Sequence, residues 1–272
     1  RFVGKKVLKL LKPQSKDYEI FIASRKQVDV ENFIKIDRKN KKDLFNIFSK
    51  HEFNVIVDFI NFSASDAEKL VSVINKLEQK PHIISISSSY VYGKPDQISH
   101  DKFFNEEDFN PQDLEPDLEM TSGWDYSKGK RSMEAYLVQN YPSFRYTIIR
   151  FPIILGEDDY TMRTYFFQDL ILNNQRIDLT GRGKKSNYIF SEEAAQAILF
   201  FIKTCKSGIY NVGLEDVLDE EEILEVFCDF YGKEKSALIG LNSEVLKSPF
   251  YVKHDFIINV DKFKELYTFT NN

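Results

Sequence analysis

Cysteine is scarce in this chain, and its scarcity excludes two kinds of small fold. Only two of the 272 residues are cysteines, Cys205 and Cys228, too few for a disulfide framework or a zinc ribbon. The four histidines are dispersed, and no two stand at the spacing of metal ligands. We therefore predict reduced thiols, no metal site and a cytoplasmic protein.

Long hydrophobic runs and an excess of basic residues are also missing. No stretch approaches the ~20 apolar residues of a membrane span, and the opening residues lack the basic and apolar regions of a secretory signal. The net charge is −5, which argues against binding nucleic acid through a broad basic surface. The 42% of hydrophobic residues is typical of a globular chain that can bury a core.

The apolar residues alternate between the periods of strands and helices, which predicts an α/β fold with βαβ units and a parallel sheet. We expect strands at 19–23, 32–36, 54–59, 82–86, 146–150 and 208–212, and helices at 3–11, 41–49, 65–80, 125–141, 160–173, 192–203 and 219–231. Residues 94–124 show no clear period and predict a long functional loop. The last forty residues look irregular, apart from a helix at 261–266.

A tyrosine and a lysine stand four residues apart in the helix predicted at 125–141. Tyr126 and Lys130 would lie on one face, one above the other. A nearby ammonium lowers the pKa of a tyrosine, which can then exchange a proton with a substrate hydroxyl or carbonyl. The plainer interpretation is an amphipathic helix with a surface lysine.

A second polar motif, Ser87-Ser-Ser-Tyr-Val-Tyr-Gly93, follows the strand predicted at 82–86. Open α/β sheets bind their ligands at the carboxyl ends of the strands, so a hydroxyl there can hydrogen-bond a substrate oxygen. The alternative is an ordinary turn rich in serine and glycine.

The order of the two motifs resembles the extended short-chain dehydrogenase/reductase family, the NAD(P)-dependent epimerases and dehydratases. Ser87 to Gly93 and Tyr126 to Lys130 look like its serine and tyrosine–lysine motifs, and residues 150–156 resemble its RPxxxxG segment. The resemblance implies a Rossmann-type doubly wound sheet with a smaller substrate lobe. It divides the chain into a dinucleotide-binding domain, 1–156 with 188–204, and a lobe, 157–187 with 205–272.

The same resemblance assigns the site residues. Ser88, Tyr126 and Lys130 would be catalytic. Fourteen others would bind the cofactor together with Tyr126 and Lys130, namely Phe2, Val3, Gly4, Ser24, Arg25, Asp37, Arg38, Phe59, Ile60, Asn61, Ser87, Phe151, Pro152 and Ile153.

Two of these positions bear on the cofactor and on the start of the chain. Arg25 follows the second predicted strand, where an arginine accommodates the 2′-phosphate of NADP and an acidic residue would bind NAD. We therefore favour NADP, with NAD left open. Gly4 would be the last glycine of the family's glycine-rich turn, so the first strand and the start of that turn are expected before Arg1.

The implied activity is hydride transfer at a hydroxyl or carbonyl of a nucleotide sugar or a similar small molecule. Epimerase, dehydratase and reductase chemistry all remain open, because the same three catalytic residues serve these reactions. Phe151-Pro152-Ile153 stands where nucleotide-sugar epimerases of the family often carry an asparagine, which weighs against that specific activity. Arg163, Arg182 and Lys184 could bind a diphosphate or be merely solvated. The family also implies a homodimer.

A rival interpretation comes from the opening segment RFVGKKVLKLL, from VIVDFI and from EDDYTMR. These segments resemble a branch of the family that is related to the chloroplast stem-loop RNA-binding proteins. On that reading the chain is a catalytically silent RNA-binding or regulatory protein on a dehydrogenase scaffold.

Overall fold

The computed structural model describes residues 2–14, 16–120, 125–179, 183–235, 238–239 and 246–270, and for residues 246–247 the backbone alone. Arg1, Arg182 and residues 121–124 of the predicted loop lie outside the described residues. Within the described part, no helix combines the length and the apolar character needed to cross a lipid bilayer.

A four-stranded parallel sheet forms the centre of the molecule, in the order β10-β6-β4-β3. Its strands are the β-branched runs β3 (Val55–Asp58), β4 (His82–Ser88), β6 (Tyr146–Phe151) and β10 (Gly208–Asn211). A separate parallel pair consists of β1 (Ile22–Ser24) and β2 (Phe33–Lys35). In the longest pairing Ser88 lies opposite Phe151, so β4 and β6 end side by side.

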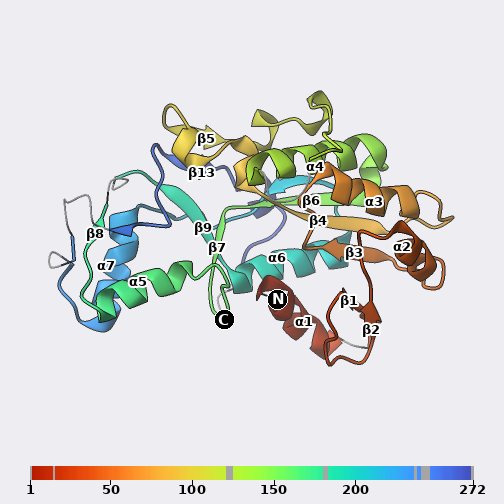
Figure 1. Cartoon of the computed structure of the whole chain (residues 1–272), viewed down its shortest axis with the longest axis horizontal. Helices are drawn as coiled ribbons and strands as arrows, with labels where there is room; N and C mark the ends of the chain where they lie inside the picture. The colour runs from red at the N-terminus through yellow and green to blue at the C-terminus, as the bar shows by residue number, and fades with distance from the viewer. Residues whose placement is uncertain are drawn as a thin grey trace.

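Helices cover both faces of this sheet (Figure 1). On one face α1 (Phe2–Leu11) packs on α6 (Ser191–Thr204), and on the other α3 (Ala64–Ile74) packs on α4 (Tyr126–Asn140), with α2 (Lys41–Phe48) beside α3. Alternate strand residues serve the two cores: Ile84 and Ile149 pack toward α1 and α6, Ile83 and Ile148 toward α3 and α4. The predicted α/β class with parallel strands is thus confirmed.

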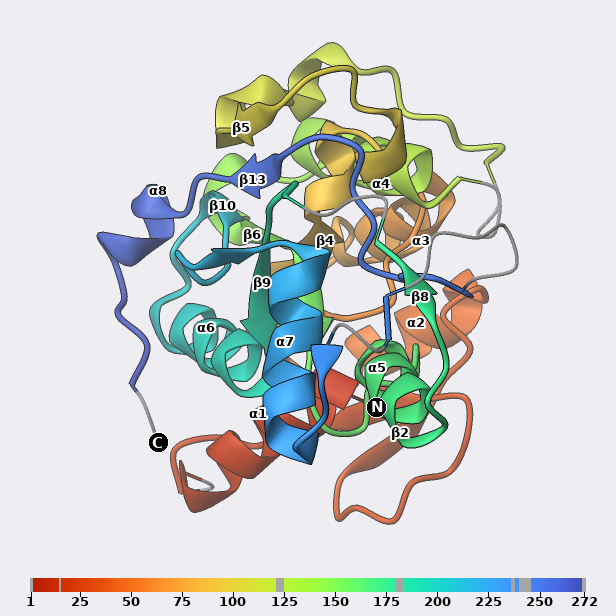
Figure 2. The same ribbon diagram turned by 90° about the vertical axis from the view of Figure 1, so that its left-hand side faces the viewer.

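A second sheet lies beside the first, in the order β11-β9-β13-β5 with β7 also paired to β9. Its strands are β5 (Lys102–Phe104), β7 (Ile153–Leu155), β9 (Ser186–Phe190), β11 (Val217–Leu218) and β13 (Phe256–Ile258). Helices α5 (Arg163–Leu172) and α7 (Glu220–Tyr231) enclose a separate apolar core there (Figure 2). Beyond them lie a short pair, β8 (Ile177–Asp178) with β12 (Leu246–Lys247), and α8 (Asp261–Lys264).

Two segments predicted to be irregular are ordered here. The loop predicted at 94–124 contains β5, which pairs in parallel with β13 from the supposedly irregular C-terminal part. The rest of that loop includes short 3-10 helices at Pro95–Gln97, Glu106–Asp108 and Pro111–Asp113. A three-residue strand whose partner is about 150 residues away leaves no local period, so the sequence pattern missed it.

Some predicted boundaries are also wrong. The helix predicted at 160–173 begins only at Arg163, because Asp158 and Met162 adopt positive φ angles of 68° and 61° that a helix cannot contain. The helix predicted at 65–80 ends at Ile74. The division into two domains and the strand expected before Arg1 stay predictions.

The buried imidazole of His82 makes the stability of the fold pH-dependent. Its Nε2 lies 2.8 Å from Thr147 Oγ1, and burial, helped by the charge of Arg145, lowers its pKa from 6.5 to about 4. Between pH 6.5 and pH 4 the unfolded chain takes up a proton that the folded chain refuses, so stability falls by about 3 kcal/mol as the pH drops through this window. The free energy of unfolding, measured with urea at several pH values across this window, should show the loss, and the loss should be smaller in His82→Gln. If the free energy of unfolding changed equally with pH in both proteins, His82 would not be its cause.

Candidate active site

Helix α4 brings Tyr126 and Lys130 to the carboxyl edge of the central sheet. The Asp125 side chain accepts a hydrogen bond from the Lys128 backbone N–H, so the helix begins at Tyr126. Tyr126 and Lys130 then lie one turn apart, with Lys130 Nζ 5.8 Å from the centre of the Tyr126 ring. The two predicted catalytic residues are therefore brought together, although Tyr126 is 48% exposed and Lys130 only 2%.

The Lys130 ammonium links the ends of two neighbouring strands. Its Nζ donates to the Asn61 carbonyl at 2.7 Å, just after β3, and to the Ile86 carbonyl at 2.6 Å, in β4. It also lies 4.8 Å from the centre of the Phe62 ring. Burial lowers the pKa of Lys130 to about 8, although the charges of Asp58 and Glu134 oppose the shift. An ammonium has three N–H donors, so two carbonyls leave one donor for a ligand.

A glycine lets the helix come this close. A Cβ on Gly129 would lie 2.5 Å from the Phe62 carbonyl oxygen, a distance that no side chain tolerates. The α4 backbone can therefore rest directly on residues 59–62, and this places Lys130 within reach of Asn61. Gly129 was the signal that could have revealed this contact, since a glycine in a helix interior usually has a packing reason.

The Tyr126 hydroxyl lies within an aromatic and polar cluster. The Ser88 side chain lies beside it, and its ring lies 6.0 Å from that of Tyr90 and 6.4 Å from that of Phe62, centre to centre. Burial raises the pKa of Tyr126 to about 12, and the Ser88 hydrogen bond and the charge of Arg163 lower it only in part. Lys130 is not among the main groups that shift this pKa, and its predicted effect on Tyr126 stays a prediction.

The structure places two neighbouring serines of the motif, Ser87 and Ser88, on opposite sides of the strand. Ser88 Oγ accepts a hydrogen bond from the Tyr90 backbone N–H at 3.2 Å and faces Tyr126. The neighbouring Ser87 points to the other side of the strand, where its hydroxyl donates to Glu134 Oε1 at 2.5 Å. Ser88 is thus the serine placed to meet a substrate oxygen, whereas the hydroxyl of Ser87 is already engaged.

Beneath this cluster lies a buried ion pair that the sequence analysis missed. Glu134, two turns along α4 from Tyr126, pairs with Arg150 at 2.7 Å, and neither side chain is exposed. Arg150 also donates to the carbonyls of Glu106 and Phe109 and to the Tyr92 hydroxyl. The pair therefore holds together the Tyr126 helix, the serine strand and the loop after β5. An arginine inside the apolar strand Tyr146–Phe151 was the signal that could have revealed it.

The two predicted cofactor residues after β2 have partners within the protein. The Arg38 guanidinium holds the buried Asp58 carboxylate with two hydrogen bonds of 2.7 and 2.9 Å. The Asp37 side chain accepts from the Lys39 backbone N–H. Arg38 is thus a structural ion-pair partner at the end of β3. Of the two predicted residues, Asp37 is exposed and Arg38 is partly buried.

The residues after β1 are more open. The Ser24 hydroxyl donates to the Lys26 carbonyl and shapes the turn, and the Arg25 side chain is exposed. The turn belongs to the separate β1–β2 pair, and no pairing joins that pair to the central sheet among the described residues.

Asn61 offers a polar atom without a partner. The residue is 1% exposed, its Nδ2 donates to Ser85 Oγ at 3.3 Å, and its carbonyl accepts from Lys130. Its buried Oδ1 has no hydrogen-bond partner among the described residues. Buried acceptors are nearly always satisfied, so this oxygen marks a place where a ligand would supply a donor.

The other predicted cofactor residues divide into core and surface. Val3 and Phe151 have buried side chains within the core formed with α6, so these two could meet a cofactor only through their backbones. Phe2, Phe59 and Ile153 are partly buried, Pro152 is buried and Ile60 is exposed.

A Cβ on Gly4 would make only ordinary contact with the Phe59 ring, at 3.8 Å, so packing within the described chain does not require a glycine there.

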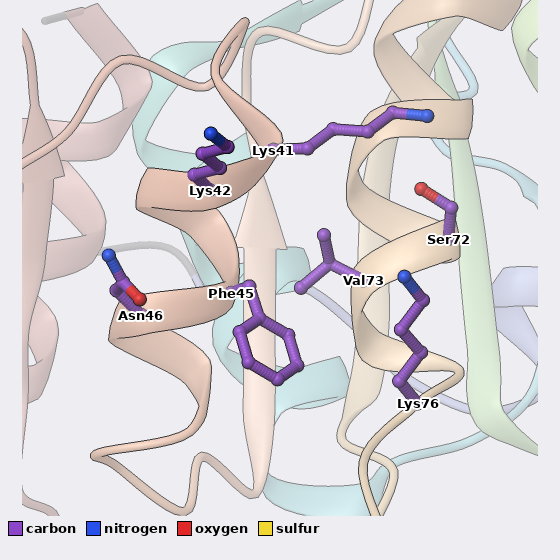
Figure 3. A pocket seen from close by; sticks show the side chains of 7 residues that line it. All are labelled: Lys41, Lys42, Phe45, Asn46, Ser72, Val73 and Lys76. Carbon is purple, nitrogen blue, oxygen red and sulfur yellow. The ribbon is translucent and has the colours of Figure 1, made fainter.

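One surface hollow lies away from this cluster. It encloses about 380 Å³ between α2 and α3, and Figure 3 shows lysine side chains around its Phe45 ring; it is lined by Lys41, Lys42, Phe45, Asn46, Ser72, Val73 and Lys76. None of these residues was predicted for the site, and the titratable side chains of the lining are lysines alone. Among the described residues no three His, Cys, Asp or Glu side chains are grouped to hold a metal.

Comparison with known proteins decides the family. The model of the NAD dependent epimerase/dehydratase family matches residues 1–213. The chain belongs to the NAD dependent epimerase/dehydratase family. The predicted resemblance and its Rossmann-type fold are therefore confirmed. No curated protein matches the chain.

Solved structures of similar fold agree with membership of this family. dTDP-glucose 4,6-dehydratase from Bacillus anthracis, in complex with NAD, has a TM-score of 0.70 at 16% identity, with 97% of this chain and 86% of that chain covered. UDP-glucose 4-epimerase from Thermus thermophilus, also with NAD, gives 0.69 at 14%, covering 97% and 89%. UDP-N-acetylglucosamine 4-epimerase from Bacillus cereus gives 0.67 at 15%, covering 100% and 89%. At such low identities these neighbours establish the fold, while family membership supports an NAD-dependent type of enzyme.

Proposed function

We propose that this protein is an NAD(P)-dependent oxidoreductase or isomerase that moves a hydride to or from a hydroxyl-bearing carbon of a nucleotide sugar or a similar small molecule. The observation that carries the proposal is the convergence of Ser88, Tyr126 and Lys130 at the ends of β3 and β4. The epimerases and the dehydratase of similar fold act on dTDP- and UDP-sugars, which supports a substrate of this class.

The residues at this edge fit a nicotinamide nucleotide. Lys130 keeps one N–H donor for a ribose hydroxyl, and Asn61 Oδ1 can accept a hydrogen bond from the cofactor. A bound nicotinamide supplies the hydride donor and acceptor. In this proposal residues 1–156 and 188–204 hold the cofactor, and residues 157–187 and 205–272 hold the substrate.

The protein's own groups handle the proton. Tyr126 stays protonated at neutral pH, because burial holds its pKa near 12, so its hydroxyl can donate a proton to a carbonyl oxygen. Ser88 hydrogen-bonds the same oxygen and steadies the charge that develops on it. In the opposite direction Tyr126 must first lose its own proton to solvent, so that its phenolate can accept the proton of the substrate hydroxyl. Positive charge near the phenolic oxygen favours the phenolate. Arg163 already contributes such charge.

The test is turnover by the full-length protein. UDP-glucose, UDP-N-acetylglucosamine and dTDP-glucose would each be incubated with the protein and with NAD or NADP. Epimers and keto products would be detected by NMR, and reduced cofactor by absorbance. An epimer, a keto sugar or an oxidised alcohol supports the proposal and assigns the reaction. A folded protein that binds cofactor but converts none of them would contradict the nucleotide-sugar part.

Nucleotide binding by an Arg25 variant should decide whether the cofactor is NADP or NAD. A guanidinium in this turn pairs well with a 2′-phosphate, so we propose NADP. Arg25→Ala should weaken NADPH binding by about tenfold or more, the usual value of a hydrogen bond between charged groups, and leave NADH binding unchanged. Fluorescence titration of both nucleotides measures this, with the exposed Lys26→Ala as control. Tighter NADH binding by the unmodified protein would assign NAD instead, the cofactor of the solved neighbours.

By the same resemblance we propose a homodimer in the cytoplasm. Analytical ultracentrifugation of the full-length protein tests the dimer.

A further inference from the structure

Two exposed phenylalanine side chains outside the candidate active site lie in basic hollows. Phe45 is 43% exposed and Phe144 is 68% exposed, although the side chain of a phenylalanine is more stable out of water. Apolar side chains that stand singly on a protein surface are common and need no explanation. These two differ, because each lies beside cationic groups and their hollows adjoin.

The first hollow lies where α2 packs against α3. Figure 3 shows the Phe45 ring and Val73 between the two helices, with the amino groups of Lys41, Lys42 and Lys76 around them. Val73 is buried, whereas Phe45 and the three lysines are exposed. The hollow therefore combines an apolar floor with a cationic rim.

Most of the charge on this rim has no partner. The lining contains three lysines and no carboxylate. Lys41 is paired with Glu68, but among the described residues no carboxylate lies within ion-pair distance of Lys42 or Lys76. The chain as a whole carries a net charge of −5, so this patch has the opposite sign to the protein that bears it. A complementary ligand would be acidic.

The second hollow repeats this chemistry. It encloses about 400 Å³ and is lined by Glu78, Gln79, Lys80, Pro142, Phe144 and Arg145. Arg145 Cζ lies 5.7 Å from the centre of the Phe144 ring, and Arg145 Nη1 donates to the Lys80 carbonyl at 2.9 Å. Two cations thus face a single carboxylate, that of Glu78.

The two hollows adjoin along the end of α3. Lys76 of the first hollow stands two residues before Glu78 of the second, so their Cα atoms are at most about 7 Å apart. An extended segment a few residues long can therefore reach both phenylalanines and the cations beside them. We call the two hollows together the basic aromatic surface.

We propose that the basic aromatic surface is a docking site for an acidic segment of a partner protein. Carboxylates of the segment would lie against Lys42 and Lys76, and an apolar side chain of the segment would cover Phe45. The exposed amide of Asn46, at the edge of the first hollow, can hydrogen-bond the backbone of the segment. No residue of this surface was predicted for the active site, so the inference does not depend on the proposed function.

The groups on this surface suit carboxylates better than phosphates. Phosphate groups are usually held by backbone N–H groups at a helix N-terminus or by a guanidinium fork. At the start of α2 the Lys42 backbone N–H is already bonded to the Asn40 side chain, at 3.0 Å. The lysines of the first hollow are point charges on flexible stems, which can follow carboxylates at varied positions along a peptide. A nucleic acid would also meet the overall negative charge of the chain.

Selection of short random peptides displayed on phage, with the full-length protein as bait, tests the inference. Enriched peptides should carry several aspartates or glutamates around one aromatic or branched apolar residue. Fluorescence anisotropy of the labelled peptides then measures their affinity. Lys42→Glu combined with Lys76→Glu should weaken it by about tenfold, because two attractive charge pairs become repulsive. Phe45→Ser should also weaken it by about tenfold, the usual effect of one apolar side chain.

The matched control is Lys9→Glu combined with Lys203→Glu. It changes the net charge by the same amount, but on α1 and α6, which cover the opposite face of the central sheet. This variant should bind the selected peptides within twofold of the unmodified protein. Circular dichroism of each variant checks that the fold is kept.

Several results would overturn the inference. The library could yield no acidic peptides, or the Lys42→Glu, Lys76→Glu protein could bind the selected peptides as tightly as the unmodified protein. Ultracentrifugation could show a dimer that these two substitutions dissociate, which would assign the surface to a second copy of the chain. A single-stranded oligouridine could bind in a way that depends on the two lysines while no acidic peptide is enriched, which would assign the surface to nucleic acid.

Discussion

Replacing Tyr126 with phenylalanine should reduce turnover by about a hundredfold to ten-thousandfold, the usual contribution of a positioned acid/base. The variant removes the Tyr126 hydroxyl, which lies beside Ser88 at the edge of the sheet. The ring itself can keep its packing against Tyr90 and Phe62. The loss should therefore appear in kcat, with nicotinamide binding and thermal stability nearly unchanged.

The matched control is Tyr136→Phe, on the same helix but packed in the core between α3 and α4. It should retain normal turnover. Steady-state kinetics of both variants with the substrate found in the turnover screen provide the measurement. A Tyr126→Phe protein with undiminished kcat would show that another group moves the proton, and would remove the central residue of the mechanism.

The largest expected loss of stability follows from breaking the buried ion pair. Glu134→Ala leaves the Arg150 guanidinium fully buried without its carboxylate, and it also removes the acceptor of the Ser87 hydroxyl. Breaking one side of such a pair typically costs about 3–5 kcal/mol. Domains are commonly stable by only about 5–15 kcal/mol, so this variant should unfold at a much lower urea concentration.

The double variant Glu134→Gln with Arg150→Met separates the charge from the packing. Removing both charges avoids the uncompensated ion, so we expect a smaller loss than in Glu134→Ala. Glu225→Ala breaks an exposed ion pair with Lys235 and should change the free energy of unfolding by less than about 1 kcal/mol. A Glu134→Ala protein as stable as Glu225→Ala would show that the buried pair does not hold the site together.

Local patterns predicted the elements that carry the site. The apolar run of β4, the amphipathic spacing of α4 and the four-residue interval between Tyr126 and Lys130 can all be read without a partner. These signals lie within one strand or one helix, where side-chain direction follows from the period alone. For the same reason the carboxyl edge of the sheet was the correct place to expect Ser88.

Contacts between distant segments could not be predicted in this way. The engagement of the Ser87 hydroxyl depends on the position of Glu134, and Arg38 meets Asp58 only after two strands are in place. The pKa of Tyr126 was predicted from one neighbouring charge, but it is set mainly by how much protein surrounds the hydroxyl. Pairing and burial of this kind appear only in three dimensions.

The central claim is that Lys130 and its neighbours form a nicotinamide site. Titration of the full-length protein with NADH and NADPH, followed by cofactor fluorescence, tests it most directly. We predict saturable binding of at least one nucleotide, retained in Tyr126→Phe and weakened in Lys130→Gln, which removes the ammonium donor. A folded protein that binds neither nucleotide would contradict the account. Salt-dependent RNA binding by that protein would then support the rival interpretation, a dehydrogenase scaffold used for recognition.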